Sequence, residues 1–173
     1  MNTGKKFEAD IKQACTEQDV DYTRMKDAGW TGEQTTRRFT SRNICDAILF
    51  YEGTLLFAEI KHRQKSLTFK SITQYNELIK KWNPEKNIFS GVIAKLDERV
   101  FFVSVPAITL MLEQLGKKSF NATDASEYGM EIAQVVPKGK KNPRPVIWEL
   151  INRLSNESTR AAIRIYRATT ENS

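Results

Sequence analysis

The stretch from Cys45 to Lys61, CDAILFYEGTLLFAEIK, constrains the fold of this chain more than any other. It reads as two apolar strands joined by a tight turn whose two central residues are Glu52 and Gly53. That turn fixes the pairing of the strands and sets Asp46 directly opposite Glu59. The hairpin therefore carries two facing carboxylates within an otherwise apolar run.

Two carboxylates in this position, with Cβ atoms roughly 5 Å apart, repel each other unless a cation lies between them. Lys61 shares a face with Glu59, because residues i and i+2 of a strand point the same way. Asp46, Glu59 and Lys61 thus form one patch that suits metal-assisted phosphodiester hydrolysis. Carboxylate oxygens bind Mg²⁺, the metal polarises the phosphate and activates water, and the lysine orients or deprotonates that water or neutralises charge. On spacing alone, a capping Asp46 with an edge-strand Glu59–Lys61 salt bridge remains the alternative.

The remaining pattern indicates a mixed α/β or α+β domain. Apolar periodicity and turn residues predict a first helix over 3–18, a short strand within 20–28, an exposed loop over 29–43, a helix over 66–82, a hairpin of 88–96 with 99–105, a helix over 106–115, a polar connection over 116–129 and a short helix over 146–154. In the helix over 66–82, one face is predicted to carry Phe69, Ile72, Tyr75, Ile79 and Trp82. We place a single folded domain at 1–154 and a basic C-terminal tail, helical in part, at 155–173.

Composition excludes several classes of protein. Hydrophobic residues make up 40% of the chain and charged residues 28%, which is typical of a globular domain. No apolar run approaches the ~18 residues of a membrane span, and the polar start is no signal peptide, so a cytoplasmic location is expected. Cys15 and Cys45 are expected to be reduced core thiols. With His62 as the single histidine, a zinc site is not expected.

The net charge of +6 is concentrated near the C-terminus. Residues 138–167 contain two acids, Glu149 and Glu157, and eight bases: Lys138, Lys140, Lys141, Arg144, Arg153, Arg160, Arg164 and Arg167. Such asymmetry indicates a polyanionic partner, most simply nucleic acid. A solvated basic tail is the alternative.

Several segments together resemble the PD-(D/E)xK nuclease superfamily, and within it the RecU-type Holliday junction resolvases, including the short forms found in phages of Gram-positive bacteria. The resemblance spans roughly residues 4–150 and rests on GKKFEADI, RMKDAG, RRFTSRNICDAILFYEGTLLFAEIKHRQKSLTFKSITQYNEL and PRPVIWEL, in that order. Longer members carry a stalk insertion with a Pro-Thr-Pro element before the aspartate strand. Here only about twenty residues separate Arg24 from Asp46, and that element is missing.

The resemblance implies a restriction-endonuclease-like core, a mixed sheet flanked by helices, with a nuclease site. Asp46 and Glu59 would bind Mg²⁺, for which Mn²⁺ can substitute, with the Ile60 carbonyl as a third oxygen ligand. Lys61 would be the catalytic lysine. Glu8 would reach the metal directly or through water, although a first-turn acid favoured by the helix dipole is the alternative.

Further family positions imply contacts with water and DNA. Gln74, on the helix after the Glu59–Lys61 strand, would position water or phosphate; otherwise it is a solvent-facing helix residue. The expected phosphate contacts are Arg24, Arg37, Arg38, Arg42, Lys138, Lys140, Lys141, Arg160, Arg164 and Arg167. A four-way DNA junction, a homodimer that cuts opposed strands, and the cytoplasm of a bacterial or phage-infected cell are implied likewise.

Two other functions fit the same sequence. A restriction or repair endonuclease would keep the nuclease core and act on another DNA, because fold alone does not fix the substrate. A non-catalytic DNA-binding module would use only the basic tail. The complete set of Asp46, Glu59 and Lys61 argues against that module, since a degenerate site does not need paired carboxylates.

Overall fold

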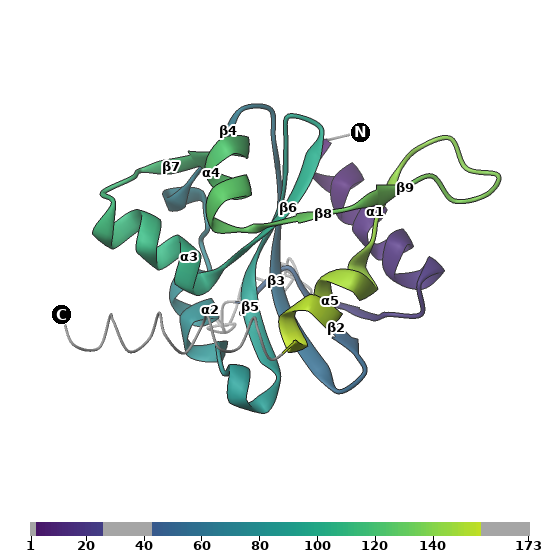
Figure 1. Cartoon of the computed structure of the whole chain (residues 1–173), viewed down its shortest axis with the longest axis horizontal. Helices are drawn as coiled ribbons and strands as arrows, with labels where there is room; N and C mark the ends of the chain where they lie inside the picture. Colours follow the sequence, from purple (N-terminus) through teal and green to yellow (C-terminus); the bar gives the residue numbers. More distant parts are fainter. Residues whose placement is uncertain (1–2, 26–42, 157–173) are drawn as a thin grey trace, which may run out of the picture.

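The computed structural model describes residues 3–25 and 43–156 (Figure 1). Its centre is a six-stranded sheet in the order β1-β2-β3-β5-β6-β8. The strands are β1 (Asp21–Arg24), β2 (Ala47–Tyr51), β3 (Thr54–Arg63), β5 (Ile88–Leu96), β6 (Arg99–Ser104) and β8 (Met130–Ile132). β3 and β5 are parallel and the other neighbours are antiparallel. The sheet is therefore mixed, as predicted.

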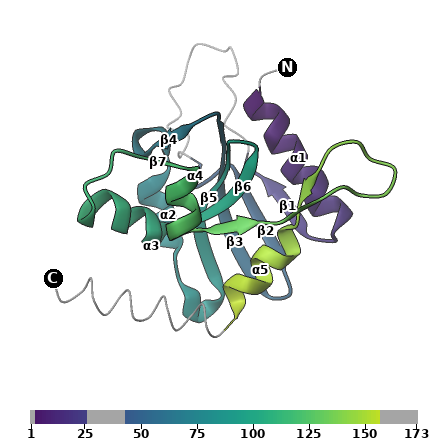
Figure 2. The same cartoon turned by 45° about the horizontal axis from the view of Figure 1, so that its top comes forward.

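Helices cover both faces of this sheet. The first face carries α1 (Thr3–Glu17) and α5 (Ile147–Ser155), and the second carries α2 (Tyr75–Lys81), α3 (Val105–Thr109) with a π-helical continuation over Leu110–Gln114, and α4 (Ala122–Tyr128). Figure 2 shows the two groups of helices on either side of the strands. Each face has its own apolar core: Phe7 and Ile147 pack in the first, and Leu78 and Ile108 in the second. None of the described helices is long and apolar enough to cross a membrane.

The β2–β3 hairpin has the predicted register. Tyr51 lies opposite Thr54 and Ala47 opposite Ala58. Glu52 and Gly53 form the turn with positive φ angles of 45° and 78°, the signs that a tight two-residue hairpin turn requires. The first helix, the β5–β6 hairpin, the helix after Ser104 and the helix over 147–155 are also confirmed.

Two segment predictions are wrong for the same reason. The helix predicted over 66–82 begins as β4 (Ser66–Thr68) and a 3-10 turn (Phe69–Ser71), and only its second half is α2. The polar connection predicted over 116–129 contains β7 (Ser119–Asn121) and α4. β4 and β7 pair with each other, with Leu67 opposite Phe120 and both side chains fully buried. Neither strand can be predicted from its own residues, because each forms only by pairing with a segment that is distant in the sequence.

The later start of the helix also changes which side of α2 is buried. Leu78 is fully buried, whereas Ile79, predicted on the inner face, is 42% exposed. A 3-10 turn (Pro84–Lys86) then leads into β5. The two cysteines are confirmed as buried, free thiols. Burial raises the pKa of Cys15 and of Cys45 to about 12, so both thiols stay protonated.

Candidate active site

The ammonium of Lys61 lies between two carboxylates. Its Nζ is 2.6 Å from Glu59 Oε1 and 3.3 Å from Asp46 Oδ2. The Glu59 side chain is fully buried, while those of Lys61 and Asp46 are 20% and 26% exposed. The three residues predicted to share a patch are therefore in direct contact, and the repulsion between the carboxylates is relieved by a cation supplied by the chain.

The β2–β3 hairpin holds these groups in place. Asp46 directly precedes β2, and its N–H donates to the Ala58 carbonyl at 3.1 Å. The Ile60 N–H donates in turn to Asp46 Oδ2 at 2.8 Å, so both the backbone and the side chain of Asp46 are tied to β3. The Ile60 side chain packs in the first core. Because side chains alternate along a strand, Glu59 and Lys61 project toward the second face, where α2 lies.

The electrostatics of this cluster favour a charged lysine. Burial by itself lowers the pKa of Lys61, but hydrogen bonds and charge from Glu59 and Asp46 raise it above its usual value overall. An uncompensated buried carboxylate is costly, and the ammonium next to Glu59 offsets that cost. In this arrangement Lys61 donates protons in hydrogen bonds and has no lone pair with which to accept one.

Gln74 completes the contacts of the buried carboxylate. It occupies the position immediately before α2. With its amide nitrogen turned toward Glu59, Gln74 donates to Oε1 at 2.6 Å and to Oε2 at 3.1 Å. The opposite orientation would set the amide oxygen against the carboxylate. Gln74 is thus an inward-facing neighbour of Glu59 and not a solvent-facing helix residue.

Glu8 lies on the other side of the sheet. Its Oε2 is 3.1 Å from Nη2 of Arg24, which pairs across the strands with Ala47 of the first core. The ion pair of Glu8 is with Arg24, whereas those of Lys61 are with Asp46 and Glu59. The structure therefore pairs two of the predicted site residues, Glu8 and Arg24, with each other on the face of the first core, away from the face toward which Lys61 projects.

The pKa of Tyr22 responds to the charges of both groups, and sequence reasoning did not single this residue out. Burial, followed by the negative charge of Glu8, raises the pKa of Tyr22 to about 12; Asp46 adds to the rise and Arg24 opposes it. The phenol therefore lies within electrostatic range of both Glu8 and Asp46. The available signal was its spacing, since Tyr22 stands two residues before Arg24 on the same strand and so shares its face.

The predicted DNA contacts are dispersed. Arg24 is 62% exposed despite its ion pair with Glu8. Lys138, Lys140 and Lys141 occupy the loop between β9 (Gln134–Val135) and β10 (Arg144–Pro145), on the side of α1. The remaining predicted contacts lie outside the described residues: Arg37, Arg38, Arg42, Arg160, Arg164 and Arg167.

The donor set of the cluster suits a hard divalent cation. Among the described residues there is no group of three or more His, Cys, Asp or Glu side chains that could hold a metal. Magnesium does not need one, because it binds through one or two carboxylates and keeps several waters. Asp46 and Glu59 are two carboxylates that already converge on a cation, the Lys61 ammonium.

Comparison with known proteins shows the fold. No protein-family model matches the sequence, and no curated protein matches it. Fourteen solved chains match the structure, among them Hjc of Archaeoglobus fulgidus, a Holliday junction resolvase from an archaeal hyperthermophile. That match has a TM-score of 0.54 and 20% sequence identity, and it covers 86% of this chain and 99% of the other. The restriction-endonuclease-like fold class is thereby confirmed.

Proposed function

We propose that this chain is a divalent-metal-dependent endonuclease that resolves four-way DNA junctions, of the RecU type. One observation carries the proposal: the Lys61 ammonium joins Asp46 to the buried Glu59 carboxylate. It occurs in a fold shared with a protein described as a Holliday junction resolvase. The resemblance of the motifs to RecU-type resolvases supports the same conclusion.

The position of the cluster weakens the salt-bridge alternative. β3 lies between β2 and β5, so Glu59 and Lys61 do not belong to an edge strand. A buried ion pair also contributes little to stability, because a well-packed apolar pair of the same volume often gives a protein that is as stable or more stable. Asp46 and Lys61 nevertheless keep about a quarter and a fifth of their side-chain surface exposed. The charged groups are thus open to a ligand from solvent.

In this proposal Asp46, Glu59 and the Ile60 carbonyl would hold Mg²⁺ or Mn²⁺. When bound, the metal polarises the scissile phosphate and lowers the pKa of a bound water. Asp46 is already fixed for such a role by the Ile60 N–H. Glu8, whose carboxylate is paired with Arg24, would contribute only through water.

The neighbouring side chains have separate roles. Lys61 acts as an ammonium that stabilises charge developing on the phosphate, since its raised pKa makes it a poor proton acceptor. Gln74 orients the Glu59 carboxylate through two hydrogen bonds. Arg24, with the predicted arginines outside the described residues, contacts phosphates. A homodimer would present two such sites to opposed strands of the junction.

Cleavage of matched DNA substrates tests this function. A labelled four-way junction and a linear duplex of the same arm sequence are incubated with Mg²⁺, with Mn²⁺ and with a chelator. We expect symmetrical cuts in the junction with either metal and none with the chelator. Equal cleavage of the duplex would assign the chain to another nuclease of the superfamily. Binding without cleavage under any metal would indicate the non-catalytic module.

A further inference from the structure

We propose that the outer face of α1 and the loop over 136–143 form a second DNA-contact surface, which binds the phosphates of an intact duplex arm and not the cleaved strand. This inference rests on the proposed function, because it assumes that DNA is the partner. The accessory contacts then lie on α1 and this loop, on the other side of the sheet from Lys61, and not in the C-terminal tail. We call the segment 136–143 the basic loop.

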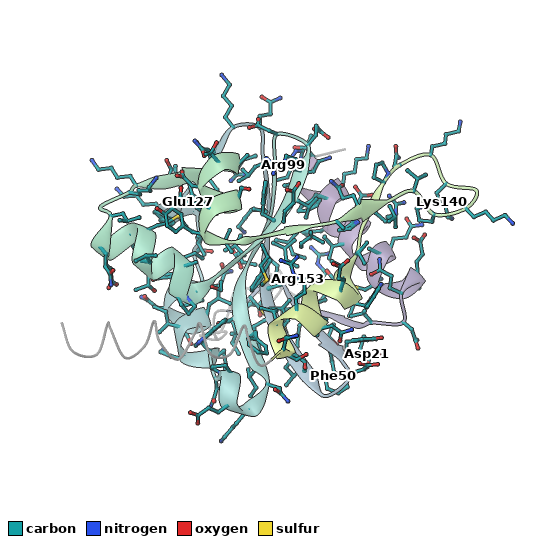
Figure 3. The ribbon with its side chains drawn as sticks, viewed as in Figure 1. Asp21, Phe50, Arg99, Glu127, Lys140 and Arg153 are labelled. Carbon is teal, nitrogen blue, oxygen red and sulfur yellow. The ribbon has the colours of Figure 1, made fainter. Side chains whose placement is uncertain are left out.

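The basic loop has a defined conformation. At its base β9 and β10 pair, with Arg144 opposite Val135. At its tip the Lys140 N–H donates to the Pro137 carbonyl at 3.0 Å, and Gly139 has a positive φ of 77°. These features describe a type II turn, in which glycine provides the positive φ that other residues resist. Figure 3 shows Lys140 pointing away from the body of the protein.

The base of the basic loop is fixed to α1. Arg144 is only 7% exposed, and its guanidinium donates to Asp10 Oδ1 at 3.2 Å and to Gln13 Oε1 at 2.7 Å. Gln18, just after α1, donates to the Pro145 carbonyl at 2.8 Å and accepts from the Ile147 N–H at 2.6 Å. A projecting loop with such a base presents its lysines in a limited set of positions. It therefore loses less conformational entropy on binding than a free tail would.

Acidic groups along α1 are largely neutralised. Glu8 is paired with Arg24 at one border of the helix, and Asp10 with Arg144 at the other. The solvent-facing side between these borders carries three exposed lysines, Lys5, Lys6 and Lys12. Glu17 remains, at the C-terminal end of the helix, where it accepts a hydrogen bond from Gln13 at 2.9 Å.

The loop itself adds charge of one sign. Lys138, Lys140 and Lys141 are all exposed, and there is no acid between residues 133 and 148. The lysines of α1 and of the basic loop thus form a positive surface that begins next to Arg24, at the border of the candidate active site, and ends at the loop tip. A polyanion is the partner that such a surface favours.

Duplex DNA fits this surface better than a small anion. The 15 residues of α1 extend about 22 Å, more than half of a duplex turn. Lysines spaced over that length meet successive phosphates, and phosphate contacts carry no sequence information of their own. Such contacts suit an enzyme that recognises branch structure and must accept arms of any sequence.

The test compares salt dependence of binding in two variants of equal charge. The loop variant is Lys138→Ala with Lys140→Ala and Lys141→Ala. The control variant is Lys80→Ala with Lys81→Ala and Lys86→Ala, on the α2 side of the molecule. Fluorescence anisotropy with a labelled four-way junction, in chelator and from 50 to 300 mM KCl, gives the slope of log affinity against log salt. Each lost phosphate contact flattens that slope by about 0.9, so the loop variant should lose up to about 2.7.

We expect the control variant to keep the wild-type slope and the loop variant to show the flatter one. An unchanged slope in the loop variant overturns the inference. An equal flattening of the slope in both variants overturns it as well, because it would reflect net charge alone. If wild-type protein binds and cleaves the junction while the loop variant keeps its slope, only this inference fails. If wild-type protein does not bind DNA at all, the proposed function fails with it.

Discussion

The two ends of the β2–β3 hairpin carry the same residue type in opposite environments. At the turn end, Glu52 is exposed to water and has a positive φ of 45°. At the open end, Glu59 is fully buried and contacts Lys61 and Gln74. The two glutamates are seven positions apart on one hairpin. Their side chains nevertheless experience surroundings of very different polarity.

The difference separates what the hairpin needs to fold from what it needs to act. A charge at the turn costs little, because water solvates it and the backbone strain is the main penalty. A charge at the buried end is costly unless partners surround it, and here Lys61 and Gln74 are provided. Changes at the open end should therefore alter chemistry and stability together. Changes at the turn end should alter stability alone.

The largest expected effect comes from removing the Asp46 charge. Asp46→Asn should abolish cleavage, because a neutral amide is a poor ligand for Mg²⁺, while an Asn oxygen can still accept from the Ile60 N–H and preserve the fold. DNA binding should persist or tighten, since repulsion of phosphate is reduced. Single-turnover cleavage and anisotropy measure the two properties. Glu52→Gln, which removes the same charge at the turn end, is the control, and cleavage by Asp46→Asn near the wild-type rate would refute the site.

Lys61→Ala should affect both rate and stability. We expect cleavage to fall by roughly 10²–10³-fold, the usual cost of removing a group that stabilises transition-state charge. Loss of the cation beside buried Glu59 should lower the free energy of unfolding by about 3–5 kcal/mol in urea titrations. Lys61→Arg should restore little cleavage, because a planar guanidinium does not replace a compact ammonium.

A second substitution distinguishes the two roles of Lys61. Adding Glu59→Gln to Lys61→Ala removes the uncompensated charge, so stability should recover while cleavage stays lost. If Lys61→Ala alone cleaves normally, the residue is only an ion-pair partner of Glu59 and Asp46.

Gln74→Ala should have a smaller effect. It removes two hydrogen bonds to Glu59 but leaves the Lys61 ion pair in place. Residues that orient metal ligands typically change affinity or activity by about 10–100-fold, and we expect the lower end of that range. The metal concentration at half-maximal rate should rise as well. Asn76→Ala, at an exposed position two residues later, is the matched control; an equal loss in that variant would contradict a specific role for Gln74.

The smallest effect is expected at the turn end. Glu52→Asn should raise the free energy of unfolding by about 0.5–1 kcal/mol, because Asn-Gly is favoured where both central residues need positive φ. Cleavage should be unchanged. Thermal unfolding followed by circular dichroism measures the shift, and Glu52→Val should move it in the opposite direction. A change in cleavage with Glu52→Asn would show that the two ends of the hairpin are coupled.

The hairpin and its charged patch could be predicted from the amino-acid sequence alone. A two-residue turn fixes the strand register, and the strand period of two then decides which side chains share a face. Register and strand period together place Asp46, Glu59 and Lys61 in one patch. The periodic first helix and the β5–β6 hairpin were predictable for the same reason, since their signals lie within a few neighbouring residues.

Tertiary structure decided the contacts between distant segments. Residues 66–68 have a helical apolar pattern, yet they form β4 because β7 pairs with them from about fifty residues away. That pairing delays the start of the predicted helix and leaves Gln74 immediately before α2, against Glu59. Likewise, only the packing of α1 on the sheet paired Glu8 with Arg24 and Asp10 with Arg144. The spacing of residues along the chain specifies local geometry. It carries no information about which remote segment will hydrogen-bond to the edge of a strand or pair with a buried charge.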